Sequence, residues 1–422
     1  MSVSKMQQSL RICIFTALVA FVLLQIQTAN SKPDLAGIKL PDGFKIDVFA
    51  DDKTKQGKLL AGARFMAFDE NGHLYVSSAK GDKVLMLPDK NKDGVADEII
   101  LVADNLNSPQ GLVFVENSLL IANQDGVVKL EKKAVANVSG NSSKHAWSSY
   151  TTPFIKHLPS GGHTLKNIKL SPDGYLFINV GSSCNVCIES DLTRATILRY
   201  TLEGKPAGAL LTLGRHQQSA VWANGLRNSQ GYAWHPQTGA MYATNNGADN
   251  RSATRNGAVN DELPPEHINK IEAGKHYGWP HCWGDSNNSK TQVEDPNFEA
   301  SIDFCKSTQA PEMTLTSHST PIGISFLDKT NWPAEYKKDA IIALHGSWNR
   351  KQLSGYKLVR IKFNNNQAVE VEDFATGWLK NNDAWGRPVD VAVGADQALY
   401  VTDDKVGVVY RISYMGKLDK PD

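Results

Sequence analysis

The densest run of polar side chains in the chain lies between Gly225 and Trp283. It contains Gly225-Leu-Arg227-Asn228-Ser-Gln230-Gly231, Asn245-Asn-Gly247-Ala248-Asp249-Asn250, Asn260-Asp261-Glu262-Leu-Pro and Tyr277-Gly-Trp279-Pro. A guanidinium, several amides, a carboxylate and backbone carbonyls freed beside a glycine suit an anionic ligand held together with a divalent cation. Taken singly, an arginine or asparagine at a strand end more often has a structural role.

A second candidate is His163, which follows Gly161 and Gly162 directly before an expected strand at residues 168–170. A loop histidine with a near-neutral pKa can act as a general base. The chain has 11 histidines, however, and for any single one of them, taken alone, a surface residue is the simpler interpretation.

Two further arginines each stand beside a tryptophan. Arg350 ends the stretch His345-Gly-Ser-Trp348-Asn-Arg, and Arg387 lies in Trp385-Gly-Arg-Pro. Aromatic and cationic pairs of this kind could frame a planar anionic cofactor, or could pack one sheet against the next.

A fourth feature alternates oxygen-bearing side chains around a glycine. Its ligand candidates are Asp89, Asn91, Asp93 and Asp97, with Gly94 at the bend. Oxygen ligands at every second position suit Ca²⁺, but Ile100 stands where an EF-hand has its last glutamate. The segment is either a structural calcium loop or a solvated acidic turn.

The elements that must position these residues are indicated by a repeat. A polar turn followed at once by a short aliphatic or aromatic run recurs six times, beginning at Asp69, Val115, Ser171, His235, Tyr336 and Gly394. Two strands joined by a tight turn form a hairpin. Six hairpins with little helix between them predict an all-β fold, a six-bladed β-propeller. The alternative, a pair of β-sandwiches, would need a linker that the sequence does not contain.

The composition excludes some function classes. The 422 residues include 45 Lys and Arg against 44 Asp and Glu, so the chain lacks the excess positive charge of a nucleic-acid-binding protein. Residues 1–31 combine a basic start, an apolar run and the small residues Ala29 and Ser31, which predicts a cleaved signal peptide; an uncleaved anchor is the alternative. We therefore expect residues 32–422 to form one secreted or periplasmic domain, with no membrane insertion once the signal is removed.

Four cysteines remain after residue 31: Cys184, Cys187, Cys282 and Cys305. An even number in an exported chain favours disulfides. Three pairings are open, and the local one, Cys184 with Cys187 and Cys282 with Cys305, is preferred because each pair shares a loop region. A zinc site made of all four is the rival interpretation.

Taken in order, these motifs resemble those of the pyrroloquinoline-quinone-dependent soluble sugar dehydrogenases, in the sorbosone or pyranose dehydrogenase-like branch related to soluble glucose dehydrogenase. The resemblance covers roughly residues 38–414. It implies oxidation of a sugar, or of a related polyol or aldehyde, by hydride transfer to the quinone with the assistance of Ca²⁺. The sugar and the electron acceptor that reoxidises the quinone are not identified.

The resemblance also implies roles for individual residues. His163 would be the general base, Arg227 would stabilise charge on the reacting quinone oxygen, and Gln110 would lie near the sugar. The quinone would be bound by Asn228, Arg350 and Arg387, and its calcium ion by the carbonyls of Gly247 and Ala248 with Asp261 nearby.

The sequence departs from the family pattern at two places. Gly162 stands where glucose-oxidising members have an aspartate that touches the sugar, and residues 181–194, with their cysteine pair, are unlike theirs. Both departures argue against glucose as the substrate. Two other functions stay open, a Ca²⁺-dependent lactonase and a non-catalytic propeller that binds protein or glycan.

Overall fold

The structure is a computed structural model that describes residues 33–51, 59–133, 146–209, 212–213, 217–298 and 302–416. The chain divides into Met1–Asp34 and Leu35–Asp422, and everything below concerns the second unit. The predicted signal peptide, residues 1–31, lies outside the described residues. In the part of the chain that is described, no helix is both long enough and apolar enough to cross a membrane.

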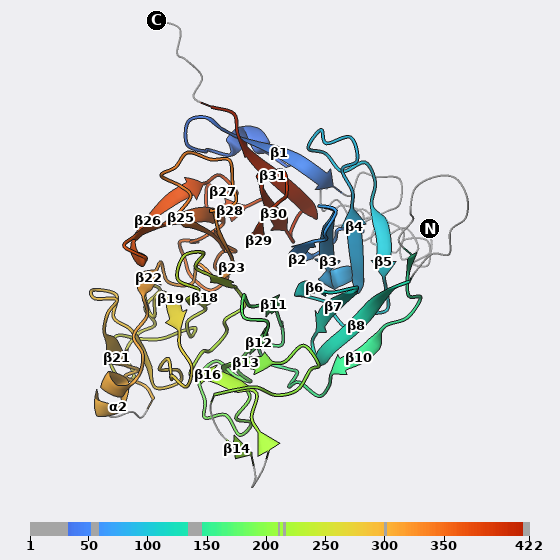
Figure 1. The fold of residues 1–422 in the computed structure, drawn as a ribbon. Helices are drawn as coiled ribbons and strands as arrows, with labels where there is room; N and C mark the ends of the chain where they lie inside the picture. The colour runs from blue at the N-terminus through green and yellow to red at the C-terminus, as the bar shows by residue number, and fades with distance from the viewer. Residues whose placement is uncertain are drawn as a thin grey trace, which may run out of the picture. The chain divides into compact units, whose positions relative to one another are not determined.

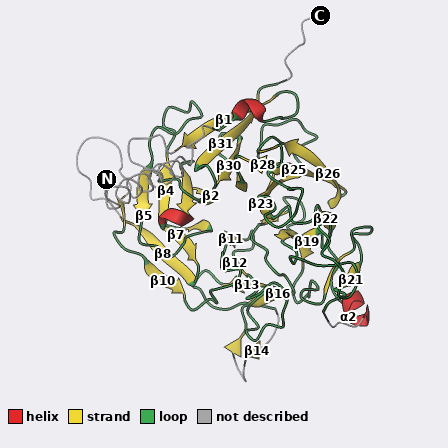
Figure 2. Ribbon diagram, turned by 180° about the vertical axis from the view of Figure 1, so that it is seen from behind, coloured by secondary structure: helices red, strands yellow, loops and turns green. Residues whose placement is uncertain are grey.

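Six antiparallel four-stranded sheets follow one another around an axis (Figures 1 and 2). Two of these blades come first in the chain: β2 (Ala63–Phe68), β3 (Leu74–Ser78), β4 (Lys83–Leu87) and β5 (Ile100–Ala103), then β6 (Leu112–Val115), β7 (Ser118–Asn123), β8 (Gly126–Lys133) and β10 (Thr152–Ile155). Three more follow: β11 (Ile168–Leu170), β12 (Leu176–Val180), β13 (Thr196–Tyr200) and β16 (Val221–Asn224), then β17 (Tyr232–Trp234), β18 (Met241–Asn245), β19 (Glu266–Ile271) and β22 (Met313–Leu315), then β23 (Pro321–Phe326), β24 (Ala340–Leu344), β25 (Lys357–Asn364) and β26 (Gln367–Ala375).

The sixth blade joins the two ends of this unit. Its strands β29 (Pro388–Val393), β30 (Leu399–Asp403) and β31 (Val408–Tyr414) are completed by β1 (Phe44–Asp51). β1 runs antiparallel to β31, with Phe44 opposite Tyr414 and Asp51 opposite Val408. This pairing closes the ring.

Several short elements lie outside the four main strands of each blade. They are the strand β9 (Ala146–Trp147), which pairs with β8, the two-stranded sheets β14 (Thr212–Leu213) with β15 (Gln217–Gln218), β20 (Cys282–Gly284) with β21 (Gln292–Glu294) and β27 (Leu379–Lys380) with β28 (Asp383–Ala384), and the short helices η1 (Leu35–Gly37), η2 (Ala79–Gly81) and α2 (Ile302–Ser307).

The predicted six-bladed propeller is confirmed. Each of the six turns found in the sequence joins the first and second strands of one blade, as the turn at Asp69 joins β2 to β3. The aliphatic runs after those turns are the second strands β3, β7, β12, β18, β24 and β30, and every residue in them is buried. A strand covered on both faces needs a continuous apolar run, which explains why the repeat was visible in the sequence.

The first strands of the blades surround the axis. β2 contacts β6 and β29, β6 contacts β11, and β23 contacts both β17 and β29. Because each first strand is antiparallel to the second, the start of one and the end of the other lie at the same end of the blade. Residues there face the axis opposite the hairpin turns.

The structure confirms the preferred cysteine pairing. Cys184 is bonded to Cys187, and Cys282 is bonded to Cys305. The second bond is buried and joins β20 to α2. The rival zinc site is therefore not formed.

The aromatic cluster behind the closing strand supplies a test of the fold. Trp332 is 1% exposed, and its ring lies 4.7 Å from that of Phe44 in β1 and 5.3 Å from that of Phe374 in β26. We expect Trp332→Ala to lower the free energy of unfolding by about 3–5 kcal/mol, because it leaves a cavity next to the ring closure. Denaturant unfolding followed by circular dichroism measures this change. Val369→Ala, at a site 54% exposed on β26, should leave stability nearly unchanged.

Candidate functional site

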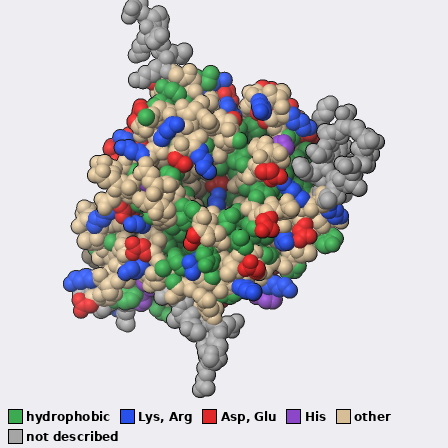
Figure 3. All heavy atoms as spheres, viewed as in Figure 1, with side chains coloured by type: hydrophobic (Ala, Val, Ile, Leu, Met, Phe, Trp, Pro, Cys, Tyr) green, Lys and Arg blue, Asp and Glu red, His purple; other side chains and the backbone are tan. Residues whose placement is uncertain are grey.

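A cavity of about 220 Å³ lies where the first strands begin and the second strands end. Its lining combines three arginines, three histidines and two carboxylates with amides and a tryptophan: Arg64, His163, Leu165, Arg227, Asn228, Gln230, Asn246, Gly247, Asp249, Glu266, His318, Thr320, Ile322, His345, Trp348, Asn349 and Arg387. Figure 3 shows the ring of blades hollowed at its centre, with acidic and basic side chains visible in the hollow.

His163 is held by the loop that follows β12. Its backbone N–H donates to the carbonyl of Ser182, and its ring Nδ1 lies 2.9 Å from Ser182 Oγ and 3.2 Å from the Ser182 carbonyl oxygen. Because the Ser182 hydroxyl donates its own hydrogen to the Cys184 carbonyl at 2.7 Å, it can only accept from His163. We therefore assign the hydrogen to Nδ1, which leaves the lone pair on Nε2.

The imidazole is neutral at physiological pH. Burial, together with the positive charge of Arg227, lowers the pKa of His163 to about 4. A neutral ring whose Nδ1 is occupied can accept a proton at Nε2.

Arg227 is fixed by hydrogen bonds on both sides of its guanidinium. Its Nη2 lies 2.9 Å from Asp249 Oδ2 and 2.9 Å from Asn185 Oδ1, and its Nε donates to the Asn185 carbonyl at 3.1 Å. The side chain is buried, and the burial lowers its pKa while Asp249 opposes the shift. Pairing with Asp249 offsets the cost of burying this charge.

A second ion pair borders the cavity through Arg64. Arg64 Nη1 lies 2.9 Å from Asp404 Oδ2, and His345 Nε2 lies 2.9 Å from Asp404 Oδ1. Arg64 also donates to Gln110 Oε1 at 3.1 Å and to Gln230 Oε1 at 2.9 Å. Burial would raise the pKa of Asp404, but His345 and Arg64 outweigh it and hold the pKa well below its usual range.

Arg387 differs from the other two arginines of the cavity. Its Nε and Nη2 donate to the carbonyls of His345 and Gly346 at 3.1 and 2.8 Å, and among the described residues no carboxylate forms an ion pair with it. Glu266 lines the same cavity and interacts electrostatically with Arg227, and burial raises its pKa to about 7, so that it carries only part of a negative charge at neutral pH. At neutral pH the cavity therefore has an excess of positive charge, which suits an anionic ligand.

Oxygen ligands for a cation lie on the loop after β18. Gly247 lines the cavity, Ala248 follows it, and the buried Asn246 Oδ1 has no hydrogen-bond partner in the described part of the chain. The unpaired amide oxygen of Asn246, the backbone carbonyls of this loop and the nearby carboxylates of Asp249 and Glu266 are the hard oxygen ligands that suit Ca²⁺. The residues present thus fit both an anionic cofactor and a hard cation.

Comparison with known proteins places the chain in a family. The family model described as TrAA12-like matches residues 39–415. The chain belongs to the TrAA12-like family.

Relatives by sequence are distant. An uncharacterized protein of Borreliella burgdorferi is 28% identical over 95% of this chain and 97% of its own length. An aldose sugar dehydrogenase of Escherichia coli is 25% identical over 61% of each chain.

Solved structures show the same fold. A carbohydrate-active enzyme of family AA12 from Trichoderma reesei has a TM-score of 0.74 at 18% identity, covering 92% of this chain and 100% of the other. The holo form of the pyranose dehydrogenase PQQ domain from Coprinopsis cinerea has a TM-score of 0.72 at 18% identity, covering 89% and 97%.

Several residues predicted for the site line the cavity of this TrAA12-like protein and others do not. His163, Arg227, Asn228, Gly247 and Arg387 line it, and Ala248 adjoins Gly247. Gln110 is fully buried behind Arg64.

Two other predicted residues lie outside the lining. Arg350 pairs with Glu262 and donates to the Ser317 carbonyl, while Asp261 accepts from the Lys351 N–H. Their roles in binding quinone and calcium stay predictions.

The predicted structural calcium loop lies between β4 and β5, away from the cavity lining. Asp89 accepts from the N–H groups of Asp93 and Gly94, Asp93 accepts from Val95, and Asp97 accepts from Lys90. Asn91 and Asp93 also bond to each other. Within the described ranges, the carboxylates of Asp89, Asp93 and Asp97 do not form a group with oxygens within 4.8 Å of one another. Calcium binding there stays a prediction.

Four residues of the cavity and its border were not predicted from the sequence: Arg64, Glu266, His318 and Asp404. Arg64 offered a signal, since a charged residue at the start of the apolar run Phe65-Met-Ala-Phe is costly to bury without a partner. Asp404 offered one too, because it follows the buried strand β30. Neither signal indicates that the two residues meet, because they are 340 positions apart.

The titration of His163 can be measured in the protein without any ligand. NMR of isotope-labelled histidine side chains should show His163 protonating near pH 4, well below the 6.5 of a free imidazole, because burial and Arg227 disfavour its charged form. A His163→Gln variant assigns the resonance. A midpoint at 6 or above would contradict a buried imidazole that is neutral at physiological pH.

Proposed function

We propose that this TrAA12-like protein is a pyrroloquinoline-quinone-dependent dehydrogenase that oxidises a sugar or a related polyol or aldehyde. The observation that carries the proposal is one cavity in which a neutral imidazole and an excess of guanidinium charge face the same space. The names of the pyranose and aldose sugar dehydrogenases that the chain resembles support the substrate class.

The residues of the cavity divide into those that would hold the cofactor and those that would act on substrate. Arg387 and Asn228 would bind the quinone carboxylates and oxygens, and the carbonyls of Gly247 and Ala248 would hold Ca²⁺. The bound quinone would supply a hydride acceptor, and Ca²⁺ would supply a Lewis acid for its reacting carbonyl.

His163 would take the proton of the substrate hydroxyl at Nε2. The neutral ring is ready to accept it at physiological pH, and the hydrogen bonds from Nδ1 to Ser182 stabilise the imidazolium that forms. Arg227 would stabilise negative charge that develops next to it, and its rigid hold by Asp249 and Asn185 means that little reorganisation is needed.

Trp348 would contact the substrate at the mouth of the cavity. It lines the cavity and yet is 72% exposed, so one face of its indole is available for stacking on a sugar ring. The two disulfides support an exported protein, secreted or periplasmic, since such bonds persist in oxidising compartments. The electron acceptor that reoxidises the quinone is a separate partner.

The proposal predicts turnover that depends on both cofactors. Metal-free mature protein is titrated with pyrroloquinoline quinone and Ca²⁺ while the quinone absorbance is followed, and aldoses are then added with an artificial electron acceptor. We expect saturable, Ca²⁺-dependent binding and sugar oxidation. His163→Gln should bind quinone equally well but turn over about 10²–10⁴-fold more slowly, because the general base is lost.

The exposed His157 provides a control, and His157→Asn should keep full activity. Absence of quinone binding, or unchanged turnover in His163→Gln, would overturn the proposed function. In the first case a lactonase or a binding module would replace it.

Arg387 should determine how tightly the quinone is held. Arg387→Ala is expected to raise the dissociation constant of the quinone about ten- to a hundredfold, because a charge-assisted hydrogen bond to a carboxylate is lost. Equilibrium titration at limiting quinone measures this. Arg255→Ala removes an equal charge from an exposed position and should leave the constant unchanged. Equal constants for the two variants would exclude the role given to Arg387.

A further inference from the structure

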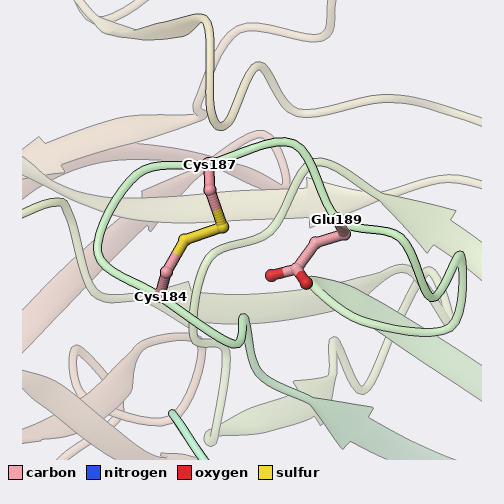
Figure 4. A group of neighbouring side chains, drawn as sticks. All are labelled: Cys184, Cys187 and Glu189. Atoms are coloured by element: carbon pink, nitrogen blue, oxygen red, sulfur yellow. A yellow bond between two sulfur atoms is a disulfide. The ribbon is translucent and has the colours of Figure 1, made fainter.

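The loop after β12 contains a disulfide close to the cavity. Cys184 and Cys187 are bonded across three positions, both are partly exposed, and Figure 4 shows the Glu189 side chain beside them. Within the described ranges these are the only three His, Cys, Asp or Glu residues whose ligand atoms all lie within 4.8 Å of one another. Because the two sulfurs are bonded to each other, they do not act as metal ligands, and their bond instead links the two ends of a short loop.

Asn185, inside this disulfide loop, contacts two residues of the cavity wall. Its side-chain oxygen accepts from Arg227 Nη2 at 2.9 Å and from the Asp249 N–H at 2.7 Å. Its side-chain nitrogen donates to the Asp249 carbonyl at 2.8 Å. Its own backbone carbonyl accepts from Arg227 Nε and from Trp279 Nε1, both at 3.1 Å. Asn185 itself does not line the cavity.

The same loop also determines which hydrogen bond His163 Nδ1 makes. The Cys184 carbonyl accepts the Ser182 hydroxyl hydrogen, and that hydroxyl then accepts from His163 Nδ1. A shift of the loop would therefore change the hydrogen bonding of the base and of Arg227 together.

Neighbouring glycines show how closely the loop is packed against His163. A Cβ atom at Gly162 would lie 2.5 Å from the carbonyl oxygens of both Ser182 and Ser183. A Cβ atom at Gly181 would lie 2.4 Å from His163 Cβ. No side chain fits at either position while the loop keeps this conformation.

We propose that the disulfide loop, residues 182–187, positions His163 and Arg227 in the cavity. Within this loop, Asn185 is the positioning residue for Arg227 and for its partner Asp249. The disulfide restricts the loop so that the Asn185 carbonyl, which no substitution can remove, stays directed at Arg227. Only the expected change in kcat rests on the proposed function. The arrangement itself can be tested without cofactor.

The first measurement uses ligand-free protein. In Asn185→Ala and in Cys184→Ser/Cys187→Ser, NMR should show the His163 titration midpoint moving up from about 4 toward the ordinary 6.5. Burial is the largest cause of the low pKa of His163 and the charge of Arg227 is the next, so a loosened loop that admits water and frees Arg227 raises the midpoint; release of Ser182 and Asp249, which both raise the pKa, opposes this change. Ile188→Ala, 67% exposed next to the loop, is the matched control and should titrate like the wild type.

The second measurement uses protein loaded with quinone and Ca²⁺. Asn185→Ala should lower kcat by about ten- to a hundredfold with little change in KM, because misplacing a reacting group affects the transition state more than substrate binding. Asn185→Asp keeps the oxygen that accepts from Arg227 and should recover part of the loss. A merely structural role would lower the melting temperature without this recovery.

The outcomes separate the two proposals. If the wild type does not oxidise sugars, the proposed function fails, but a raised His163 midpoint still supports the positioning role of the loop. If the midpoints and kcat of the loop variants equal those of Ile188→Ala, the positioning role is wrong even in an active dehydrogenase. Should Asn185→Ala fail to fold, the double serine variant decides the question, because it keeps every hydrogen-bonding group of Asn185.

Discussion

The backbone ladder between β1 and β31 is the interaction on which the cavity depends. It is the contact that joins the first strand of the large unit to its last, and it lets the sixth blade pack against the first. Arg64, at the start of β2, and Arg387, just before β29, both line the cavity. Its wall therefore includes residues of the first and sixth blades, which this closure brings together. An open ring would separate Arg64 from Asp404, because Asp404 follows the second strand of the sixth blade. The cost of burying those two charges is offset only when the ring is closed.

A second constraint is that the cavity holds charged groups in a protein interior. Arg227 and Arg64 are each matched to an aspartate and to amide oxygens, so their positions are fixed by the need to satisfy buried polar groups. Arg387 donates to two carbonyls and lies over the Tyr356 ring, and among the described residues no carboxylate forms an ion pair with it, so the excess charge of the cavity is concentrated at this residue. A preorganised arrangement of this kind stabilises an anion without having to rearrange when the anion arrives.

The fold was predictable from the sequence and the site only in part, for one physical reason. Each blade repeats a local signal, a turn followed by a fully buried second strand, and a local signal can be read from consecutive residues. Motifs at strand ends, such as those around His163, Arg227 and Gly247, were recognisable because several polar residues stand together. Pairs of residues that come from different blades could not be recognised in the sequence. Arg64 and Asp404 are far apart in sequence and meet only through closure of the ring, and Arg350 has a neighbour, Glu262, that competes for its charge.

The two departures from the family pattern, Gly162 and the cysteine-containing segment, are one feature of the structure. The carbonyls of Ser182 and Ser183 occupy the space that a side chain at position 162 would need. An aspartate there, as the resemblance places it in glucose-oxidising enzymes, is incompatible with the loop as it stands. The loop in turn supplies Asn185 as a hydrogen-bond partner of Arg227 and Ser182 as one of His163, so the space next to Gly162 is filled by the segment that holds these two side chains. Under the proposed function, a chain with this loop has no carboxylate at position 162 to accept from a sugar hydroxyl, and selection among sugars would depend on other groups at the cavity mouth, of which Trp348 is the most exposed aromatic.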